Sequence, residues 1–310
     1  MSWILIAIIA YFILAIVNLA DKFLLEKVLP SAKTYTFLVG FLGLIILIIA
    51  PWFLNWPGLY LTSFNIFIGF LLPLALILLY TALRLGEASK IITIIGGSVP
   101  IFTILLSFVL LGERFTNLQY TAFFYLIFGT LIISYFPGGH ELWTRIFIWF
   151  GLESQKRLRS IIIALSASFI FALFFVGSKY LYNSQEFISA FIWIRIGSFL
   201  AVLFLLLSKK NRKEIFKNIN KLRGKKRAIF LGNQGLAAGG FFLQNYAIAL
   251  GSVALVNALQ GVQYAFLLIL ASFLTIFYPQ VIKEKISKLI IFQKMIAIIL
   301  ISFGLYFIIQ

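Results

Sequence analysis

Arg195 is the residue of this sequence whose type and position most clearly indicate chemistry within an apolar environment. It lies in the apolar run 187–207, with Trp193 close to it along the chain. An ionised side chain deep in a membrane is costly and commonly marks a substrate or ion pathway. Because a guanidinium group pairs with planar oxyanions through two N–H groups, we predict that Arg195 holds a substrate carboxylate or phosphate, with Trp193 lining the same cavity. The alternative is a structural arginine that bonds backbone carbonyls or extends to the membrane surface.

Two neighbouring apolar segments carry most of the remaining polar side chains. One contains Gln244 and Asn245, and the next contains Asn257, Gln260 and Tyr264. The last three are spaced i, i+3 and i+7, which places them on one face of a continuous helix. Amides that face lipid find no hydrogen-bond partner, so these residues are expected to line a cavity and to bind a polar ligand. The alternative is that they join one helix to another.

The corresponding segment in the first half of the chain, 91–111, presents Thr93 and Gly96. A glycine lets a ligand or a second helix approach the backbone closely, so Gly96 has either role. The predicted substrate-binding residues are therefore Arg195, Trp193, Gln244, Asn245, Asn257, Gln260, Tyr264, Thr93 and Gly96.

Several kinds of chemistry lack the residues that they need. The sequence has no Cys and one His, His140, so neither a metal site nor a cofactor is predicted. It contains no Gly-rich phosphate-binding motif of the Walker type, and direct use of ATP is not expected. Asp21 and Glu113 lie at the ends of apolar segments, which favours facilitated diffusion or exchange over a proton antiporter. A membrane-embedded enzyme would require clustered acidic or His residues, so the protein is not expected to be an enzyme.

The composition indicates that most of the segments that carry these residues lie within a lipid bilayer. Of 310 residues, 62% are hydrophobic and 11% are charged, whereas soluble proteins average about 45–50% and about 25%. A helix that crosses a bilayer needs about 20 apolar residues. The predicted class is an all-α polytopic membrane protein with ten transmembrane helices. We expect them near 3–20, 34–54, 63–83, 91–111, 118–136, 160–179, 187–207, 228–250, 252–278 and 286–309.

The basic residues predict the orientation of these helices. The sequence has 26 Lys and Arg against 9 Asp and Glu, a net charge of +17, and most basic residues fall in the odd-numbered loops, ten of them in 209–227. Lys and Arg accumulate on the cytoplasmic side, so these loops are predicted to be cytoplasmic. The protein is predicted to lie in the cell (inner) membrane with both termini on the outer side. We interpret 209–227 as an anchor at anionic lipid head groups and expect no nucleic-acid partner.

An internal repeat divides the chain into two halves. A shift of 165 residues pairs 82–108 with 247–273 and gives eight identities, among them Gly96 with Gly261. Five helices per half is an odd number, so the second half enters the membrane from the opposite side, and inverted repeats are typical of transporters. The predicted units are a first five-helix repeat over 1–136, a connecting loop with a candidate interfacial helix over 137–159, and a second repeat over 160–310.

Two motifs of the first half resemble a known family. The segment 110–116, Leu-Leu-Gly-Glu-Arg-Phe-Thr, resembles the end of an EamA repeat of the drug/metabolite transporter superfamily, and 80–89 resembles the tight turn between its third and fourth helices. In the second half only Glu284 corresponds to the acidic residue of that motif. The resemblance implies ten helices around a central cavity. Family members usually keep both termini in the cytoplasm. Either this chain is inserted the other way up, which is the interpretation we favour, or the number of predicted helices is wrong by one.

These expectations favour one function and leave an alternative. The favoured function is transport of small polar or amphipathic metabolites, amino-acid-like or anionic, by alternating access through a cavity between the inverted repeats. The alternative is a flippase for a lipid-linked sugar or phosphate, with Arg195 at the head group. An opening to the bilayer at the side of the protein would favour the flippase. The expected partners are a small-molecule metabolite, the lipid bilayer and a second copy of the chain.

Overall fold

The computed structural model describes residues 2–29, 31–85, 88–135, 155–220, 222–277 and 288–309. Within these ranges all regular structure is helical and no strand occurs, so the predicted all-α class is confirmed. The elements are α1 (Ser2–Lys27), α2 (Ala32–Leu42), the 3₁₀ helix η1 (Gly43–Ile49), α3 (Ala50–Phe53), α4 (Leu59–Leu85), α5 (Ala88–Leu110), α6 (Asn117–Tyr135), α8 (Gln155–Ser184), α9 (Phe187–Leu205), α10 (Lys209–Ile219), α11 (Lys225–Leu250), α12 (Val253–Ala258), α13 (Gln260–Phe277) and α14 (Lys288–Ile309).

Length and composition make this an integral, multi-pass membrane protein. Among the described residues, five helical stretches are long and apolar enough to cross a membrane: Ser2–Asp21, Ala32–Phe53, Leu59–Leu83, Leu158–Ser184 and Phe187–Leu205. Shorter apolar helices lie at Ile94–Leu110, Asn117–Ile132, Val253–Leu267 and Met295–Ile308. The total of ten crossings and the inverted relation of the halves remain predictions at this point.

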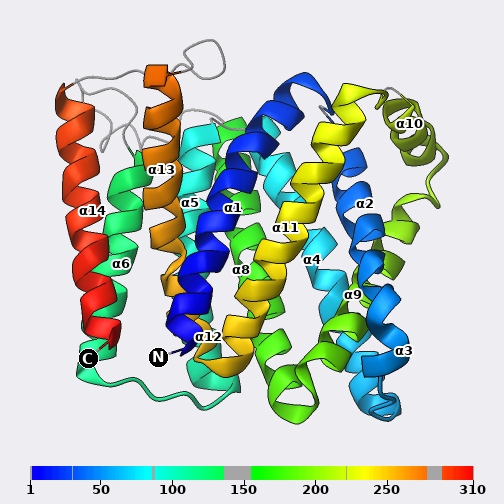
Figure 1. The fold of residues 1–310 in the computed structure, drawn as a ribbon, viewed down its shortest axis with the longest axis horizontal. Coiled ribbons are helices and arrows are strands. Elements are labelled where there is room, and N and C mark those ends of the chain that lie inside the picture. Colours follow the sequence, from blue (N-terminus) through cyan, green and yellow to red (C-terminus); the bar gives the residue numbers. More distant parts are fainter. Residues whose placement is uncertain are drawn as a thin grey trace.

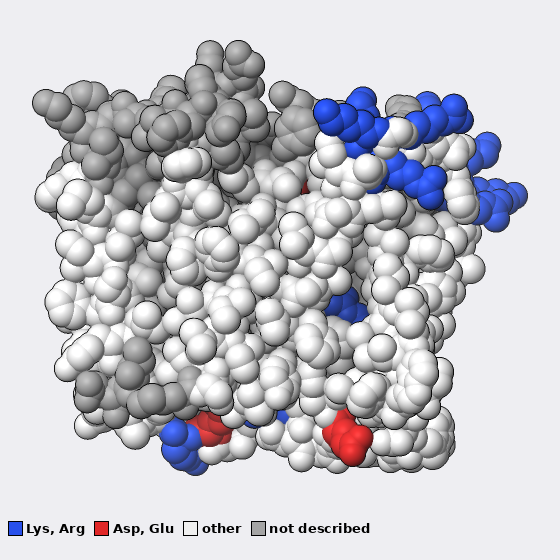
Figure 2. Space-filling view, in the orientation of Figure 1, with Lys and Arg blue, Asp and Glu red and all other residues white. Residues whose placement is uncertain are grey.

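The long helices lie side by side and run between two ends of the bundle (Figure 1). Helix α10 lies at one end, which we call the basic end. Both chain termini lie at the other, which we call the terminal end (Figure 1). Lys and Arg gather at the basic end, and the face shown in Figure 2 is almost free of charge between the two ends, among the residues that are described. This separation is what a bilayer requires of a protein that spans it.

The helices pack in a reciprocal pattern between the two halves of the chain. Helix α1 packs against α11 and α13, while α8 packs against α4 and α5. Helices α6 and α14 pack against each other, with Gly129 of α6 against Ile301 and Gly304 of α14 against Leu126. Small residues at such contacts let two helix backbones approach closely, which favours association inside a membrane.

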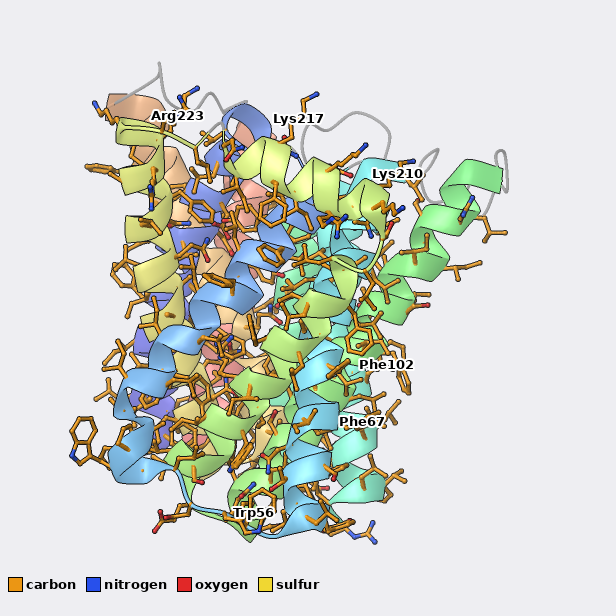
Figure 3. The ribbon with its side chains drawn as sticks, turned by 90° about the vertical axis from the view of Figure 1, so that its right-hand side faces the viewer. Trp56, Phe67, Phe102, Lys210, Lys217 and Arg223 are labelled. Atoms are coloured by element: carbon orange, nitrogen blue, oxygen red, sulfur yellow. The ribbon has the colours of Figure 1, made fainter. Side chains whose placement is uncertain are left out.

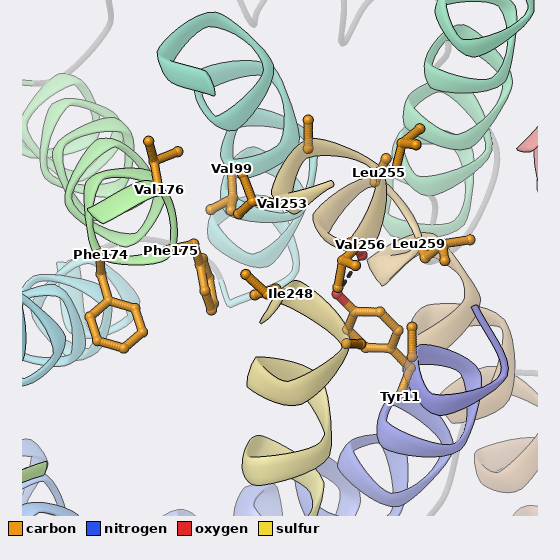
Figure 4. Packing of buried hydrophobic residues seen from close by; sticks show 14 of the residues in the cluster. Tyr11, Val99, Phe174, Phe175, Val176, Ile248, Val253, Leu255, Val256 and Leu259 are labelled. Carbon is orange, nitrogen blue, oxygen red and sulfur yellow. Dashed lines mark hydrogen bonds between the residues drawn. The ribbon is translucent and has the colours of Figure 1, made fainter. Parts of the chain in front are cut away.

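A continuous buried cluster joins α1, α5, α8, α11 and α12 (Figure 4). Phe174 and Ile248 are fully buried in it, and so is Tyr11, whose hydroxyl donates a hydrogen bond of 2.7 Å to the Val256 carbonyl oxygen. The phenol thereby joins the first helix of one half to α12 of the other. The core therefore lies between the halves rather than within either one.

Two predicted spans consist of more than one helical element. The segment predicted at 34–54 is divided into α2, η1 and α3. The segment predicted at 252–278 is divided at Leu259 into α12 and α13. The basic run 209–227 contains a helix of its own, α10, and the predicted interfacial helix falls within 136–154, outside the described residues.

Candidate ligand site

Arg195 of α9 is buried among aromatic rings, with 7% of its surface exposed. Its Cζ atom lies 4.3 Å from the centre of the Phe241 ring on α11 and 5.0 Å from that of Phe191 on α9. The face of an aromatic ring attracts a cation, and the attraction is stronger away from water. The two rings therefore stabilise the guanidinium group but provide no anion.

The guanidinium group has no hydrogen bond or ion pair within the part of the chain that the structure describes. Arginine carries five N–H donors, and a buried charge normally has a hydrogen-bonded partner of opposite charge. A Cβ atom added to Gly43 would lie 3.5 Å from both Cδ and Nη1 of Arg195, so the first residue of η1 lies beside the side chain. A 3₁₀ stretch within a longer helix often marks a functional hinge. Arg195 thus offers unused donors next to such a stretch.

The lateral face of the protein is hollowed about half-way between its two ends. Figure 2 shows basic atoms at the bottom of this hollow, between α11 and α2 in the orientation of Figure 1. The residues that surround Arg195 come from α9, α11 and η1, the continuation of α2. An anionic group that reached this depth could therefore keep an apolar part in the bilayer.

Trp193 lies away from Arg195. Residues two positions apart on a helix point in nearly opposite directions. The Trp193 Nε1–H group donates a hydrogen bond of 3.0 Å to the Asn55 carbonyl oxygen, and its ring meets that of Trp56 edge-on at 5.8 Å. Trp56 lies at the terminal end of the bundle (Figure 3), so the structure does not bring Trp193 and Arg195 together.

The amides of α11 are bonded to neighbouring helices. Gln244 Nε2 donates a hydrogen bond of 3.4 Å to the Tyr11 hydroxyl oxygen, and both residues are buried. Asn245 Oδ1 accepts a hydrogen bond of 3.0 Å from the hydroxyl of Tyr182 on α8. These contacts match the alternative reading of the sequence, in which amides join helices.

Asn257 is also bonded to another helix. Its Nδ2 group lies 3.4 Å from Oγ1 of Thr103 on α5, within the buried core. Gln260 is half-buried at the start of α13. Asn257 and Gln260 lie on either side of Leu259, where α12 ends and α13 begins.

Two of the predicted site residues, Gly96 on α5 and Tyr264 on α13, lie against each other. A Cβ atom added to Gly96 would lie 2.8 Å from the Tyr264 hydroxyl oxygen, so the absence of a side chain at Gly96 leaves the room that the phenol occupies. Packing therefore explains this glycine. The side chain of Thr93 lies outside the described residues.

A polar network near the basic end was not expected from the sequence. The Tyr35 hydroxyl of α2 donates a hydrogen bond to Asp21 Oδ1 on α1, and the Asn233 Nδ2 group of α11 donates another at 2.5 Å. Gln234 Nε2 donates to the Tyr35 hydroxyl oxygen at 3.0 Å. The sequence does hold one signal for this network. The predicted spans place Asp21, Tyr35 and Asn233 near the same side of the membrane.

A pocket of about 310 Å³ lies at the terminal end, where α8 turns into α9. It is lined by Asn55, Pro57, Leu61, Ser184, Gln185, Glu186 and Ser189. The Asn55 Nδ2 group donates a hydrogen bond of 3.0 Å to Glu186 Oε2 across it. Asn55 also accepts from Trp193, so this pocket belongs to the terminal end and is separate from Arg195.

Comparisons with known proteins agree with this architecture. One protein of known crystal structure superimposes with a TM-score of 0.66 over 99% of this chain and 97% of its own, at 16% sequence identity, which shows the fold alone. No curated protein matches the sequence. Residues 1–135 match the EamA-like transporter family. This match over residues 1–135 places the protein in the drug/metabolite transporter superfamily. Members of the EamA family are transporters.

The EamA-matched region meets the second half of the chain at the terminal end. The Ser252 hydroxyl donates a hydrogen bond of 2.6 Å to Oε2 of Glu113, the acidic residue of the EamA-like motif. Ser252 also caps α12, because its Oγ accepts from the Leu255 N–H group at 3.4 Å. Nearby, Lys179 Nζ donates to the Ala249 carbonyl oxygen at 3.0 Å. The motif residue therefore contributes to a contact between the halves of this EamA-like transporter.

Proposed function

We propose that this membrane transporter carries small metabolites with a carboxylate or phosphate group, and that Arg195 binds that group. The observation that supports the proposal is a buried guanidinium group held by two phenylalanine rings, with no hydrogen bond or ion pair among the described residues. Leaving a charge unpaired at such a depth is costly, so a bound anion would complete the site. The predicted amides of α11 and α12 then serve mainly to hold the surrounding helices together.

We infer that the chain crosses the membrane ten times as two inverted five-helix repeats. In this arrangement α1 corresponds to α8 and α4 to α11. The reciprocal packing supports the inference, because α1 packs against α11 as α8 packs against α4. Inverted repeats allow the two halves to exchange conformations, so that a cavity open on one side becomes open on the other.

We also propose that the basic end faces the cytoplasm and that the protein resides in the cell (inner) membrane. Helix α10 and the residues that follow it carry most of the described basic charge at one end (Figures 2 and 3). Lys and Arg are retained on the cytoplasmic side. Both termini, at the other end, would then lie outside (Figure 1).

A second candidate function is a flippase for a lipid-linked sugar or phosphate. The hollow in the lateral face favours it, because basic atoms at its bottom lie at a depth that a lipid head group would cross (Figure 2). In this case Arg195 binds the head group in passage while the acyl chains stay in the bilayer.

A thermal-shift screen of the purified protein tests the anion site. The probes are amino acids, dicarboxylates, sugar phosphates and short-chain lipid phosphates. A ligand that binds only the folded state at about 100 times its Kd stabilises it by about 2.7 kcal/mol. We expect Arg195→Ala to abolish the shift and Arg195→Lys, which keeps the charge but not the paired N–H geometry, to reduce it.

Arg114→Ala is the matched control. Its guanidinium carbon also lies over a ring, 4.3 Å from the centre of Phe108, but the side chain is exposed at the terminal end. This variant should show the same ligand-induced thermal shifts as the unmodified protein. Equal shifts in Arg195→Ala and the unmodified protein would overturn the anion site, and shifts limited to lipid phosphates would favour the flippase over the metabolite carrier.

A further inference from the structure

Asp21 joins three helices near the basic end through one carboxyl oxygen. Its Oδ1 atom accepts hydrogen bonds from Tyr35 on α2 and from Asn233 on α11. Helices α1 and α2 belong to the first half and α11 to the second. Gln234 Nε2 extends the network from α11 to the Tyr35 hydroxyl oxygen at 3.0 Å. A single carboxylate therefore connects the two halves at this end.

The network rests on a compact apolar cluster. Leu24, Leu29, Tyr35, Leu222 and Phe230 are buried there, and the Tyr35 and Phe230 rings meet edge-on with centres 5.6 Å apart. This cluster, which we call the basic-end plug, brings together α1, α2 and α11. Its packing and the Asp21 network close the same end of the bundle.

The groups that face Asp21 are uncharged or phenolic. Helix α2 presents the Tyr35 phenol, and α4 presents the Tyr80 phenol, whose ring lies 5.9 Å from that of Tyr35. Helix α11 presents Asn233 and Gln234. Asp21 has no ion pair within the described side chains, among which Lys22 and the last turn of α13 are not included. Within that scope, the carboxylate charge is balanced by hydrogen bonds alone.

We propose that the Asp21 carboxyl group is a proton-binding site that locks the basic end of the bundle, and that proton uptake unlocks it. The proposal rests on the proposed carrier function and adds the ion that drives or regulates it. Hydronium from the aqueous phase transfers its proton to one carboxylate oxygen and leaves as water. A neutral carboxyl group accepts weaker hydrogen bonds than a carboxylate, so the link from α1 to α2 and α11 weakens.

The terminal end carries a different kind of lock. There the halves meet through the Ser252 hydroxyl and Glu113, while Lys179 bonds the end of α11. Release at the basic end while this contact persists gives a cavity open on one side only, which is what alternating access requires. Proton uptake at Asp21 thus opens the basic end selectively.

Cysteine accessibility tests the proposal without knowledge of the substrate. The natural chain has no Cys, so Leu24→Cys places one thiol in the basic-end plug, where Leu24 is fully buried. Labelling by a charged maleimide is compared between about pH 8 and about pH 5. Lys210→Cys, exposed on α10, corrects for the pH dependence of thiol reactivity itself.

The corrected labelling rate at Leu24→Cys should rise about tenfold on acidification, the change expected for the loss of one hydrogen bond to a charged group. Asp21→Asn, which mimics the neutral carboxyl, should give fast labelling at both pH values. Tyr35→Phe removes one donor, so it should raise the rate at high pH and keep a pH response. A rate independent of pH with Asp21 present, or an equal response in Asp21→Asn, overturns the proposal.

Two further comparisons keep the outcome clear. Should Asp21→Asn fail to fold, Tyr35→Phe decides, because a labelling rate equal to that of the parent at high pH contradicts the lock. Arg195→Ala in the Leu24→Cys background should label as the parent does, since Arg195 lies outside the network. If labelling of Leu24→Cys does not depend on pH while the Arg195-dependent thermal shifts persist, the proton site alone is rejected. If labelling depends on pH but no ligand gives an Arg195-dependent thermal shift, the anion site alone is rejected.

Discussion

Gly69 of α4 and Gly197 of α9 lie backbone to backbone. A Cβ atom added to Gly69 would lie 2.8 Å from Gly197 Cα and 2.2 Å from the Ile194 carbonyl oxygen. The Ser198 hydroxyl donates a hydrogen bond of 2.9 Å to the Gly69 carbonyl oxygen at the same contact. Because Arg195 is two residues from Gly197, this contact between the halves also fixes the depth and rotation of the arginine.

We predict that Gly69→Ala destabilises the protein by about 1–3 kcal/mol, the usual cost of forcing a methyl group into a filled space. Gly232→Ala on α11 is the control, since a Cβ atom there meets nothing within 4 Å. Alanine favours a helix over glycine by about 1 kcal/mol, so the control should be neutral or more stable. The measurement is the Tm of each purified variant, and equal values for the two variants would contradict the close contact.

Ser252→Ala should weaken the terminal end. The change removes both the hydrogen bond to Glu113 and the N-cap of α12, and loss of an N-cap alone costs about 0.5–2 kcal/mol. Ser166→Ala is the matched control, because that exposed hydroxyl, among the residues that the structure describes, bonds to Ile162 of its own helix. Thermal unfolding should show a lower Tm for Ser252→Ala alone, and a similar fall in both variants would argue against a specific contact between the halves.

Asn245 and Tyr182 should behave as a coupled structural pair. Asn245→Leu and Tyr182→Phe each remove their mutual hydrogen bond, so the double variant should lose less stability than the sum of the single variants. The expected coupling is about 0.6 kcal/mol, typical of hydrogen bonds between membrane helices. Unfolding of the four proteins measures it. Additive losses would contradict the coupling, and loss of the ligand shifts in Asn245→Leu would place the amide in the binding site.

The buried arginine was predictable, but its surroundings were not. Arg195 is conspicuous because it interrupts a long apolar run, and a single charge there has few structural explanations. Its partners come from α11 and η1, and no local pattern specifies contacts between segments far apart in the chain. The change of the second segment to 3₁₀ geometry at Gly43 also went unpredicted, because a 3₁₀ stretch of Gly, Leu and Ile has the composition of an ordinary membrane helix.

Asp21 shows where reasoning from the position of a residue in the sequence falls short. The sequence places this carboxylate at the end of an apolar segment. In the structure α1 continues to Lys27, and Asp21 accepts hydrogen bonds from α2 and α11. The amides of α11 were expected to face away from lipid, and Gln244 and Asn245 are buried. Whether such groups meet a ligand or another helix depends on packing between helices, which a single sequence does not specify.

The proposed orientation rests on charge alone and can be tested independently. A green fluorescent reporter fused after Ile309 should be dark, and an alkaline phosphatase fused there should be active, because both chain ends are expected outside. The same reporters inserted between α10 and α11, after Arg223, should give the opposite result. Replacing Lys210, Lys213 and Lys217 of α10 with Gln should reduce this asymmetry, since each basic residue contributes about 1 kcal/mol near an anionic surface. A fluorescent fusion after Ile309 would place α10 outside the cell and bring this chain back to the usual orientation of the EamA family.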